Sequence, residues 1–495
     1  MAVIGLDVGT TGVKSTVFDE NAQVIGHAYR EYNLIGEREG RFELNPAELW
    51  EKALEVLGES AKGCGRDVKA ISVTSFGESF VCLDGRDQPL CNTMIYMDKR
   101  GAEECAEYRA LRSEKEIFSE CGQFIDPMFA VYKLRWMRKH LPEILEKTKK
   151  LCFIADFMTY RLGAAHQCDY SLAARSAMFN VFKKEWIAKA IEFSTIDLSM
   201  LPQPVPSGSV TGHMSREMAQ KLGMTENVKL IVSGHDQILA ALGSGAWAPG
   251  DVANGMGTVD CITAVLPGDS LDLEALIRYN FPVVPFMDTG CYVTYAFNMS
   301  GGCAIKWFRD TLAQDLKDRK DAYKVLDDEA QGDPTGILAL PCLAGGGTPY
   351  MDGATPAALA GLRLGTSRGQ LFRAFLEGET YEMMLNIECL EAVGVDIQKV
   401  VTVGGGSNSK LWMQIRADVF GRPVYLPENK EAGTLAGAML CYTATGVYPT
   451  LRAAQEAMIR YEDSYLPRPE RTAAYRPHYE RYKKFYHAVR DLFER

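Results

Sequence analysis

Apolar runs alternate with amphipathic stretches along the chain. Residues 4–19 form two apolar runs around a polar, glycine-rich turn, and another apolar run begins at Val68. Between them, residues 45–62 repeat apolar positions at helical spacing behind Asn45, a capping residue, and Pro46, which suits a first turn. Strands that alternate with helices in this way predict an α/β fold.

The pattern begins again in the middle of the chain, after a Gly/Pro break. Residues 252–266 repeat the apolar strand, Gly-Thr turn and apolar strand of residues 4–19, which hints at duplicated halves that face a shared cleft. We therefore expect an N-terminal domain over residues 1–245 and a C-terminal domain over residues 246–450. Residues 451–495 are charged, helical in period and rich in Tyr and Arg, so we expect a helical extension that packs on the domains.

Length and composition narrow the class of protein. A chain of 495 residues exceeds one ordinary core, which supports two domains. Hydrophobic residues make up 47% and charged residues 24%, and the sequence has no run of about 18 apolar residues, the length that a membrane span needs. The first residues lack the basic and long apolar regions of a signal peptide. We expect a cytoplasmic protein with no membrane partner.

Cysteine content and charge disfavour two further classes. The 13 cysteines are an odd number, and the closest pair, Cys82 and Cys91, is nine residues apart, which fits neither a disulfide framework nor a Cys-x-x-Cys metal site. The net charge is −10 and no long Lys/Arg run is present, so the cationic surface that a phosphate backbone requires is not expected. Nucleic acid is therefore not an expected partner.

A first candidate site is the turn DVGTTGVK at residues 7–14. Its glycines let the backbone pass close to a ligand, and amides and hydroxyls can converge on a phosphate, so the cofactor-binding candidates are Gly9, Thr10, Thr11 and Lys14. A carboxylate beside a polyphosphate is repulsive unless a cation lies between them, which makes Asp7 a candidate Mg²⁺ ligand. The alternative is an ordinary hairpin in which backbone amides satisfy Asp7.

A second glycine-rich turn, NGMGTVDC at residues 254–261, repeats this device. Its candidate ligand-binding residues are Gly257 and Thr258, although by itself the turn is no more specific than a hairpin. Two such turns in similar halves could grip one nucleotide phosphate chain from both sides.

A third glycine-rich stretch runs from a β-branched strand through Gly404, Gly405 and Gly406 into a helix, with Asn408 in the connection. A glycine turn between a strand and a helix N-terminus is a nucleotide-binding geometry. The stretch has neither Gly-x-Gly-x-x-Gly nor a Walker lysine, which disfavours a Rossmann dehydrogenase and a P-loop kinase.

The stretch LIVSGHDQILAALGSGA places Asp236 at the end of an apolar strand, where a general base would face a cleft. A helix-capping role for Asp236 is an equally good local interpretation. The neighbouring His235 fits packing or hydrogen bonding better than metal ligation.

These stretches, in this order, resemble the FGGY family of carbohydrate kinases, which belongs to the actin-like ATPase superfamily. GLDVGTTGVK is similar to the first phosphate motif, GHDQ to the catalytic-Asp motif, GMGT to the second phosphate motif and GGGSNSKLWMQIRADVFGRPV to the adenosine motif. MFAVYKLRWM at residues 128–137 is similar to a signature built on Lys133 and Trp136, with Ala130 where the family usually has Ser, Thr or Pro. Residues 348–378 and 431–440 also resemble the C-terminal half of the family.

The resemblance implies two ribonuclease-H-like α/β domains with ATP and sugar in the cleft between them. By that resemblance, Asp236 would take the proton from a substrate hydroxyl and Asp7 would hold Mg²⁺. The same resemblance implies that Thr10, Thr11 and Thr258 line the phosphate path and that residues 404–406 approach the nucleotide.

The resemblance also points to an acceptor site. Its substrate-binding candidates are Glu78, Tyr96, Asp98, Arg100, Asp236 and Gln237. Glu78 stands where glycerol kinases carry Glu and xylulokinases carry His, whereas Gly77 replaces the Arg of glycerol kinases. The alternative for Glu78, Asp98 and Arg100 is a surface ion pair.

Taken with the resemblance, the residues predict an enzyme that phosphorylates a hydroxyl of a small sugar or polyol with ATP and Mg²⁺. A pentulose such as xylulose is the favoured substrate, and glycerol, a tetritol or another ketose stays open. The alternatives from other classes are a catalytically silent sugar- or nucleotide-binding protein and an actin-like ATPase on the same scaffold. A homodimer is compatible with the sequence.

Overall fold

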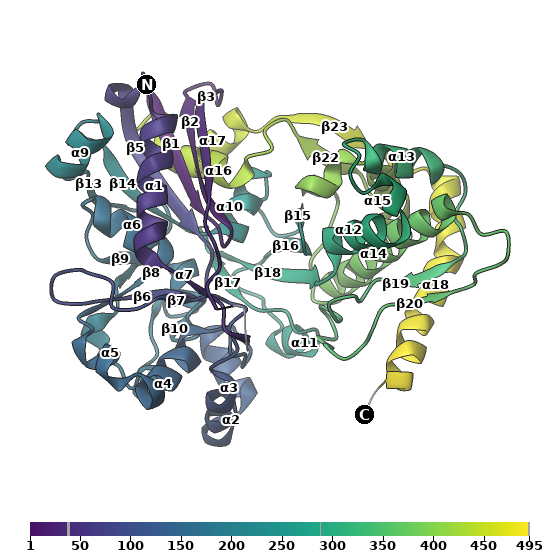
Figure 1. The fold of residues 1–495 in the computed structure, drawn as a ribbon, viewed down its shortest axis with the longest axis horizontal. Coiled ribbons are helices and arrows are strands. Elements are labelled where there is room, and N and C mark those ends of the chain that lie inside the picture. The colour runs from purple at the N-terminus through teal and green to yellow at the C-terminus, as the bar shows by residue number, and fades with distance from the viewer. Residues whose placement is uncertain (37–39, 288, 494–495) are drawn as a thin grey trace. The chain divides into compact units, whose positions relative to one another are not determined.

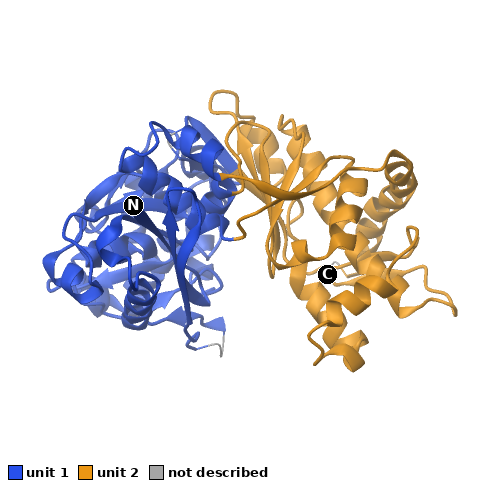
Figure 2. Cartoon of the chain, turned by 90° about the horizontal axis from the view of Figure 1, so that it is seen from above, with its two compact units in different colours: residues 1–243, 282–293, 431–458 blue, residues 244–281, 294–430, 459–495 orange. Residues whose placement is uncertain are grey.

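The computed structural model describes residues 1–36, 40–287 and 289–493. The chain divides into two compact units, shown in blue and orange in Figure 2. Unit 1 comprises residues 1–243, 282–293 and 431–458, and unit 2 comprises residues 244–281, 294–430 and 459–495. Among the described residues, no helix is long and apolar enough to cross a membrane.

The centre of unit 1 is a six-stranded sheet with the order β13-β14-β5-β1-β2-β3 (Figure 1). In chain order its strands are β1 (Ala2–Val8), β2 (Gly12–Asp19), β3 (Val24–Glu31), β5 (Val68–Ser75), β13 (Val210–His213) and β14 (Lys229–His235). β1 pairs antiparallel with β2 and parallel with β5, while β14 is parallel to β5 and antiparallel to β13.

Helices cover both faces of this sheet. On one face Ser15 of β2 lies 2.7 Å, hydroxyl to hydroxyl, from Ser60 of α1 (Pro46–Ser60), a helix capped by Asn45 and started by Pro46. On the other face α16 (Ala432–Ala444) packs on β1 and β5 and against α10 (Asp236–Gly243). The remaining helices of unit 1 are α2 (Ala102–Leu111), α3 (Glu114–Cys121), α4 (Ala130–His140), α5 (Pro142–Lys147), α6 (Ile154–Leu162), α7 (Tyr170–Ala174), α8 (Ala188–Ser194), α9 (Arg216–Leu222) and α17 (Leu451–Met458).

Unit 2 has a sheet of the same design. Its strands belong to a seven-stranded sheet with the order β17-β18-β16-β15-β21-β22-β23 and the bounds β15 (Val252–Met256), β16 (Asp260–Leu266), β17 (Val284–Phe286), β18 (Cys291–Asn298), β21 (Val400–Val403), β22 (Val424–Pro427) and β23 (Tyr461–Tyr465). Of these, β17 and the first residues of β18 fall within residues 282–293, which are grouped with unit 1. β15 is antiparallel to β16 and parallel to β21, β22 is parallel to β21, and β23 is antiparallel to β22. This sequence of pairings repeats that of β1, β2, β5, β14 and β13, so the two sheets share one topology and the expected α/β class is confirmed.

The helices of unit 2 include the two longest in the chain. They are α11 (Leu273–Arg278), α12 (Gly301–Leu312), α13 (Ala322–Glu329), α14 (Arg368–Ala392), α15 (Lys410–Phe420) and α18 (Pro469–Phe493). α14 contacts α12, α13, α15 and α18, so it forms the centre of the helical layer. Because helices surround α14, even charged residues of this helix are buried. Arg373 and Glu377 are examples, and they form an ion pair with each other.

The compact units differ from the contiguous domains expected from the sequence. Residues 431–458 belong to unit 1 because α16 lies directly on its sheet: a Cβ at Gly437 would overlap the Ser72 hydroxyl, and one at Gly5 would overlap Thr434. Residues 451–495 are not a single helical extension either. They contain the strand β23, which lies at the edge of the unit 2 sheet. Residues 461–464 of this strand are exposed, so the sequence shows no run of apolar residues that would predict a strand there.

Candidate active site

The first glycine-rich turn connects β1 and β2 in unit 1. Gly9 N donates to Gly12 O over 2.9 Å, and the Tyr32 hydroxyl donates to Gly9 O, which anchors the turn from the neighbouring chain segment. Thr10 is half-buried and Thr11 is exposed, so neither residue belongs to the core. The arrangement presents short polar side chains on a fixed backbone, as a phosphate site requires.

Asp7 and Lys14 occupy directly paired positions of β1 and β2. The Lys14 ammonium lies 3.3 Å from Asp7 Oδ2 and 2.9 Å from a carboxylate oxygen of Glu431, the residue that precedes α16. A Cβ at Gly433 would lie 3.6 Å from Asp7 Oδ2, so the first turn of α16 passes close to this carboxylate. The sequence analysis identified Asp7 and Lys14 as neighbours in the first turn. It did not identify Glu431, because this residue lies near Lys14 only in the folded chain.

The electrostatics of this group suit a divalent cation. Burial raises the pKa of Asp7, the Lys14 charge opposes that rise, and the Glu431 charge adds to it. The pKa of Lys14 is raised as well, because the attraction of both carboxylates outweighs its burial. Two carboxylates that share one ammonium form a hard oxygen-donor set, which is the chemistry that Mg²⁺ prefers. The residues therefore fit a Mg²⁺ ion.

Asp236 follows β14 and begins α10, as its place after an apolar strand predicts. Its side chain is 30% exposed, and His235 Nε2 lies 3.3 Å from Asp236 Oδ1, which also accepts a 2.6 Å hydrogen bond from Gln237 N. Burial, followed by the charges of Asp7 and Glu78, raises the pKa of Asp236 to about 8. The carboxyl thus stands within electrostatic reach of both Asp7 and Glu78.

Glu78 lies in a tight turn between β5 and β6 (Phe80–Leu83), with a φ of 62° that non-glycine residues seldom adopt. Its buried carboxylate pairs with the Arg175 guanidinium, which also donates to Gln123 Oε1 over 2.9 Å and lies 5.1 Å from the centre of the Phe129 ring. The strained conformation and the buried charge pair together mark this turn as a functional candidate.

Gly77 explains why Arg175 can reach Glu78. A Cβ at Gly77 would lie 3.0 Å from Arg175 Cγ and 3.0 Å from His235 Cδ2, so a larger residue would compete for this space. Sequence reasoning missed Arg175 and Gln123, which come from segments far from Glu78. An arginine directly after the small-residue stretch SLAA was a weak signal.

Lys133 contacts the backbone of the same turn. It is fully buried in α4, and its ammonium donates to Ile95 O over 2.8 Å and to Glu78 O over 3.4 Å. Burial lowers the pKa of Lys133 to about 7, although the nearby Glu78 and Asp98 charges oppose that shift. One side chain therefore joins the Glu78 turn to the strand end that leads to Tyr96.

Tyr96 lies at the edge of this group and is 40% exposed. Burial, with smaller effects from the Glu78 and Asp236 charges, raises the pKa of Tyr96, which places its hydroxyl in the field of both carboxyls. A neutral phenol at this position can donate to and accept from a sugar hydroxyl.

Asp98 and Arg100 belong to a different group. Asp98 is fully buried, accepts a 2.9 Å hydrogen bond from Arg100 Nε and another from Phe42 N, and Arg100 also donates to Glu43 Oε1 over 2.5 Å. The Arg100 guanidinium lies 5.0 Å from the centre of the Trp136 ring. These residues pair with one another around the buried Asp98, so they do not form the surface ion pair of the alternative interpretation, and hydroxyl binding by Asp98 and Arg100 stays a prediction.

In unit 2 the second glycine-rich turn packs on the start of α12. Gly302 N donates to Gly257 O over 2.9 Å, and Cys303 N donates to Thr258 O over 3.2 Å, while the side of the turn that carries Gly257 and Thr258 is exposed. The turn is held through the Gly257 and Thr258 carbonyls and through the Gly257 amide, which donates to Val259 O over 3.0 Å, and Thr258 lies on its exposed side.

The third glycine-rich stretch lies beside the second. Gly404, with a φ of 99°, would collide with Met256 O if it carried a Cβ, and Gly406 approaches the Met256 side chain equally closely. Asn408 Nδ2 donates to Gly405 O over 3.1 Å, and Lys430 Nζ lies 3.4 Å from Asn408 Oδ1. The structure therefore brings Gly257, Thr258 and the glycine run together at the ends of β15 and β21, as two nucleotide-binding turns require.

A buried network fixes this pair of turns. Arg416 of α15 donates to Asn254 Oδ1 over 2.5 Å and pairs with Asp260, and Asn254 Nδ2 donates to Asp260 Oδ1 over 2.6 Å. The network ties both strands of the hairpin to the helix that follows the glycine run. All three side chains are buried, and sequence reasoning did not identify them.

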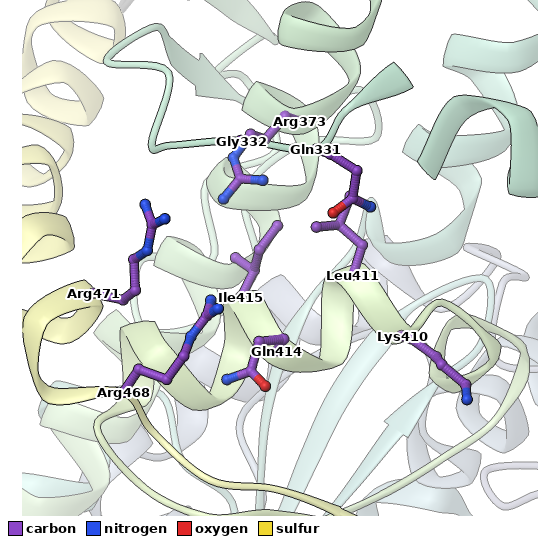
Figure 3. A pocket seen from close by; sticks show the side chains of 9 residues that line it. All are labelled: Gln331, Gly332, Arg373, Lys410, Leu411, Gln414, Ile415, Arg468 and Arg471. Atoms are coloured by element: carbon purple, nitrogen blue, oxygen red, sulfur yellow. The ribbon is translucent and has the colours of Figure 1, made fainter. Parts of the chain in front are cut away.

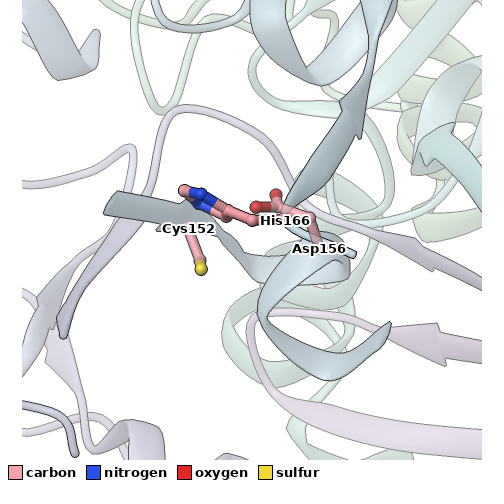
Figure 4. A group of neighbouring side chains, drawn as sticks. All are labelled: Cys152, Asp156 and His166. Atoms are coloured by element: carbon pink, nitrogen blue, oxygen red, sulfur yellow. The ribbon is translucent and has the colours of Figure 1, made fainter. Parts of the chain in front are cut away.

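A Cys, Asp and His group lies elsewhere in unit 1 (Figure 4). The potential ligand atoms of Cys152, Asp156 and His166 lie within 4.8 Å of one another, and His166 Nε2 is 3.0 Å from Leu151 O. Burial raises the pKa of both Cys152 and Asp156 well above their ordinary values, so metal ligation, which requires the deprotonated forms, is disfavoured more here than at Asp7, where the Lys14 charge opposes the rise. We assign no metal to this group.

Comparison with protein-family models gives two matches. The model of the N-terminal domain of the FGGY family of carbohydrate kinases matches residues 2–243, and the model of its C-terminal domain matches residues 252–445. Together they cover most of the chain, including every glycine-rich turn and Asp236.

Curated relatives extend over nearly the whole chain. A xylulose kinase from Bacillus subtilis is 26% identical over 99% of this chain and 97% of its own length. An autoinducer-2 kinase from Salmonella choleraesuis is 27% identical over 99% and 95%, and a glycerol kinase from Listeria monocytogenes is 29% identical over 90% of each chain.

Solved structures agree with the fold described above. A xylulose kinase from Rhodospirillum rubrum has a TM-score of 0.90 at 25% identity, and both chains are covered completely. A ligand-bound xylulose kinase from Lactobacillus acidophilus has a TM-score of 0.91 at 23% identity, with 99% of each chain covered. The two-sheet architecture is therefore that of these kinases.

Proposed function

Because this chain belongs to the FGGY family of carbohydrate kinases, we propose that it transfers the γ-phosphate of ATP to a hydroxyl of a small, neutral sugar or polyol. A pentulose such as xylulose is the favoured acceptor, since a xylulose kinase is among the relatives that match over nearly their whole length. The expected products are a sugar phosphate and ADP.

The observation that carries this proposal is the position of Asp236. Its pKa, about 8, is raised by burial and then by the charges of Asp7 and Glu78, so the carboxyl lies within electrostatic reach of both the candidate Mg²⁺ ligand and the candidate acceptor-binding turn. A general base needs a pKa near the operating pH and a place beside the hydroxyl that it deprotonates. In our proposal Asp236 is that base and takes the proton as the acceptor oxygen attacks phosphorus.

Asp7, with Glu431 and Lys14, would hold the metal in unit 1. Mg²⁺, when bound, neutralises negative charge on the phosphates. Lys14, 3.3 Å from Asp7 and 2.9 Å from Glu431, would keep these carboxylates at a fixed distance and supply a cation for the phosphate path beside Thr10 and Thr11. In unit 2 we assign the nucleotide to Gly257, Thr258, Gly404, Gly405, Gly406 and Asn408.

The charge of the acceptor turn favours a neutral substrate. The Arg175 guanidinium is compensated by the buried Glu78 carboxylate, and the Lys133 ammonium faces backbone carbonyls, so neither is offered to a substrate carboxylate. Glu78, Tyr96 and Gln237 would instead exchange hydrogen bonds with hydroxyls, which act as donors and acceptors. We therefore propose ketoses and polyols as substrates, and not aldonates.

A coupled ADP-release screen tests this proposal. Pentuloses, hexuloses, glycerol, tetritols and aldonates would be compared with a reaction that contains no acceptor. We expect ADP release with a neutral acceptor, a xylulose-like pentulose giving the highest kcat/KM. Release that does not depend on any acceptor would instead indicate an ATPase, and no release with any compound would indicate a silent binding protein.

A further inference from the structure

A cationic pocket lies in unit 2, apart from the residues assigned to catalysis. Figure 3 shows this pocket, which has a cavity volume of about 360 Å³ and is walled by α14, by α15, by the residues after α13 and by the start of α18. Its size falls at the small end of the range for small-molecule sites. No mechanism described above uses it.

The charge of its lining is opposite to that of the protein. Four of its nine lining residues are cationic, namely Arg373, Lys410, Arg468 and Arg471, and none of the nine is acidic, although the chain carries a net charge of −10. The guanidinium groups of Arg373, Arg468 and Arg471 point into the same space in Figure 3, while Lys410 extends from the rim. Three of these cations pair with carboxylates outside the lining, so an anion is favoured by the donors that remain open toward the pocket and not by an excess of positive charge.

Two of the arginines, Arg468 and Arg373, form ion pairs with buried carboxylates that are not part of the pocket lining. Arg468 Nη2 lies 2.6 Å from Asp418 Oδ2, and Arg373 Nε lies 2.8 Å from Glu377 Oε1, while the other groups of Arg373 donate to Ala330 O and the Tyr475 hydroxyl. Asp418 and Glu377 are fully buried. The arginines are therefore pre-oriented, as a site for a planar or tetrahedral oxyanion requires.

Donor capacity remains on the pocket side. Arg468 uses Nε and Nη2 for Asp418, and Arg471 uses only Nη1, for the largely exposed Asp333. Within the described part of the chain, no partner accepts from Arg468 Nη1, from Arg471 Nη2 or from the Lys410 ammonium. The guanidinium groups of Arg468 and Arg471 face a pocket whose lining includes the apolar side chains of Leu411 and Ile415, while Lys410 extends away from its rim (Figure 3).

We propose that this pocket binds a phosphate group, either as inorganic phosphate or as the phosphate ester of a small polyhydroxy compound. The guanidinium groups of Arg468 and Arg471 bind the phosphate oxygens, and the buried Arg373 provides the charge at the inner wall. Leu411 and Ile415 contact the carbon chain of an ester. This site is separate from the proposed kinase function and does not depend on it.

Isothermal titration calorimetry of the full-length protein provides the test, with inorganic phosphate in one arm and ribose 5-phosphate in the other. Arg471→Glu reverses a charge whose only ion-pair partner is exposed, so the substitution leaves the buried pairs intact. The matched control is Arg319→Glu, which reverses the charge of an exposed arginine paired with Asp321 outside the pocket. Lys410→Glu adds a second measurement at the rim.

We expect Arg471→Glu to weaken binding at least tenfold, Lys410→Glu to weaken it about threefold, and Arg319→Glu to change it less than twofold, because a charge-assisted hydrogen bond is lost only at the pocket. If Arg471→Glu weakens the binding of inorganic phosphate and of ribose 5-phosphate equally, the phosphate group alone is sufficient for binding. If the substitution weakens only the binding of ribose 5-phosphate, the pocket is a site for phosphate esters. If the unsubstituted protein binds neither probe, the proposal is overturned. The proposal is also overturned if Arg471→Glu binds the probes as tightly as the Arg319→Glu control. If Arg471→Glu does not fold, the same comparison is made with Lys410→Glu.

Discussion

The carboxylate of Glu78 pairs with the guanidinium of Arg175 across 97 residues of chain, and both side chains are buried. The pair holds a glutamate whose φ of 62° is unfavourable for a residue with a Cβ. We infer that Arg175 positions Glu78 for the acceptor, so its loss should affect acceptor binding and stability together.

Arg175→Met is expected to lower the free energy of unfolding by about 3–5 kcal/mol, because it leaves a buried carboxylate without its partner. The KM for the acceptor should rise at least tenfold while the KM for ATP stays within twofold. Urea denaturation and initial-rate kinetics measure both effects. In the double variant Glu78→Gln/Arg175→Met, much of the lost stability should return, since the uncompensated charge is gone.

Arg112→Met serves as the control for that prediction. It removes another arginine of unit 1, whose Nη1 lies 3.0 Å from Glu120 Oε2 outside the acceptor turn. This variant should lose stability without any change in the acceptor KM. A parallel rise in the acceptor KM of both variants would mean that destabilisation alone explains the Arg175 effect.

The raised pKa of Asp236 predicts the pH profile of the reaction. A general base works only when deprotonated, so kcat/KM should increase with pH and level off above about pH 8, where the carboxyl is ionised. Asp236→Asn removes the base and should reduce kcat by about 10²–10⁴-fold while ATP still binds. Initial rates between pH 5.5 and pH 9.5, together with fluorescence titration of ATP, provide the data. A flat profile, or a variant with most of its turnover, would contradict the assignment.

Much of this site follows from local sequence patterns. The hairpin around Gly9 fixes the pairing of Asp7 with Lys14, and the end of an apolar strand fixes the place of Asp236. Both depend on the alternation of apolar positions and on turn chemistry, which act over a few residues.

The rest depends on contacts between distant segments. Glu431 reaches Lys14 only because the small residues of α16 let that helix lie directly on β1, and Arg175 reaches Glu78 only because Gly77 leaves space for it. No periodicity in one sequence reports such contacts, since they depend on how complete elements pack. The same reason explains why the sequence did not indicate Phe42 and Glu43, which come from a distant segment and hydrogen-bond to Asp98 and Arg100.

The three-residue group of Asp7, Lys14 and Glu431 predicts how the enzyme uses metal. Asp7→Asn should raise the Mg²⁺ concentration for half-maximal activity at least tenfold at fixed ATP, because a neutral amide is a weaker ligand than a carboxylate. Glu431→Gln should produce a smaller increase, since in our proposal it acts alongside Asp7. ADP release as a function of total Mg²⁺ tests both variants. Glu226→Gln, at an exposed residue paired with Arg216, is the control, and a Mg²⁺ dependence of Asp7→Asn equal to that of the control would refute the assignment.

Lys133 predicts a dependence of stability on pH that can be separated from catalysis. Its pKa is about 7 in the folded chain, against an ordinary value of 10.5, so between these values the unfolded state binds more protons than the folded state. The free energy of unfolding should therefore rise with pH in this window, with a maximal contribution from Lys133 of ~1.4 kcal/mol per pH unit. Lys133→Met should remove this contribution, while the control Lys139→Met, at an exposed position of the same helix, should retain it.

The Lys133→Met variant should also have a higher acceptor KM, because the ammonium no longer bonds to the Glu78 and Ile95 carbonyls. Urea denaturation at pH 7, 8, 9 and 10 provides the comparison, and identical slopes for Lys133→Met and the unsubstituted protein would exclude a buried lysine that titrates near pH 7.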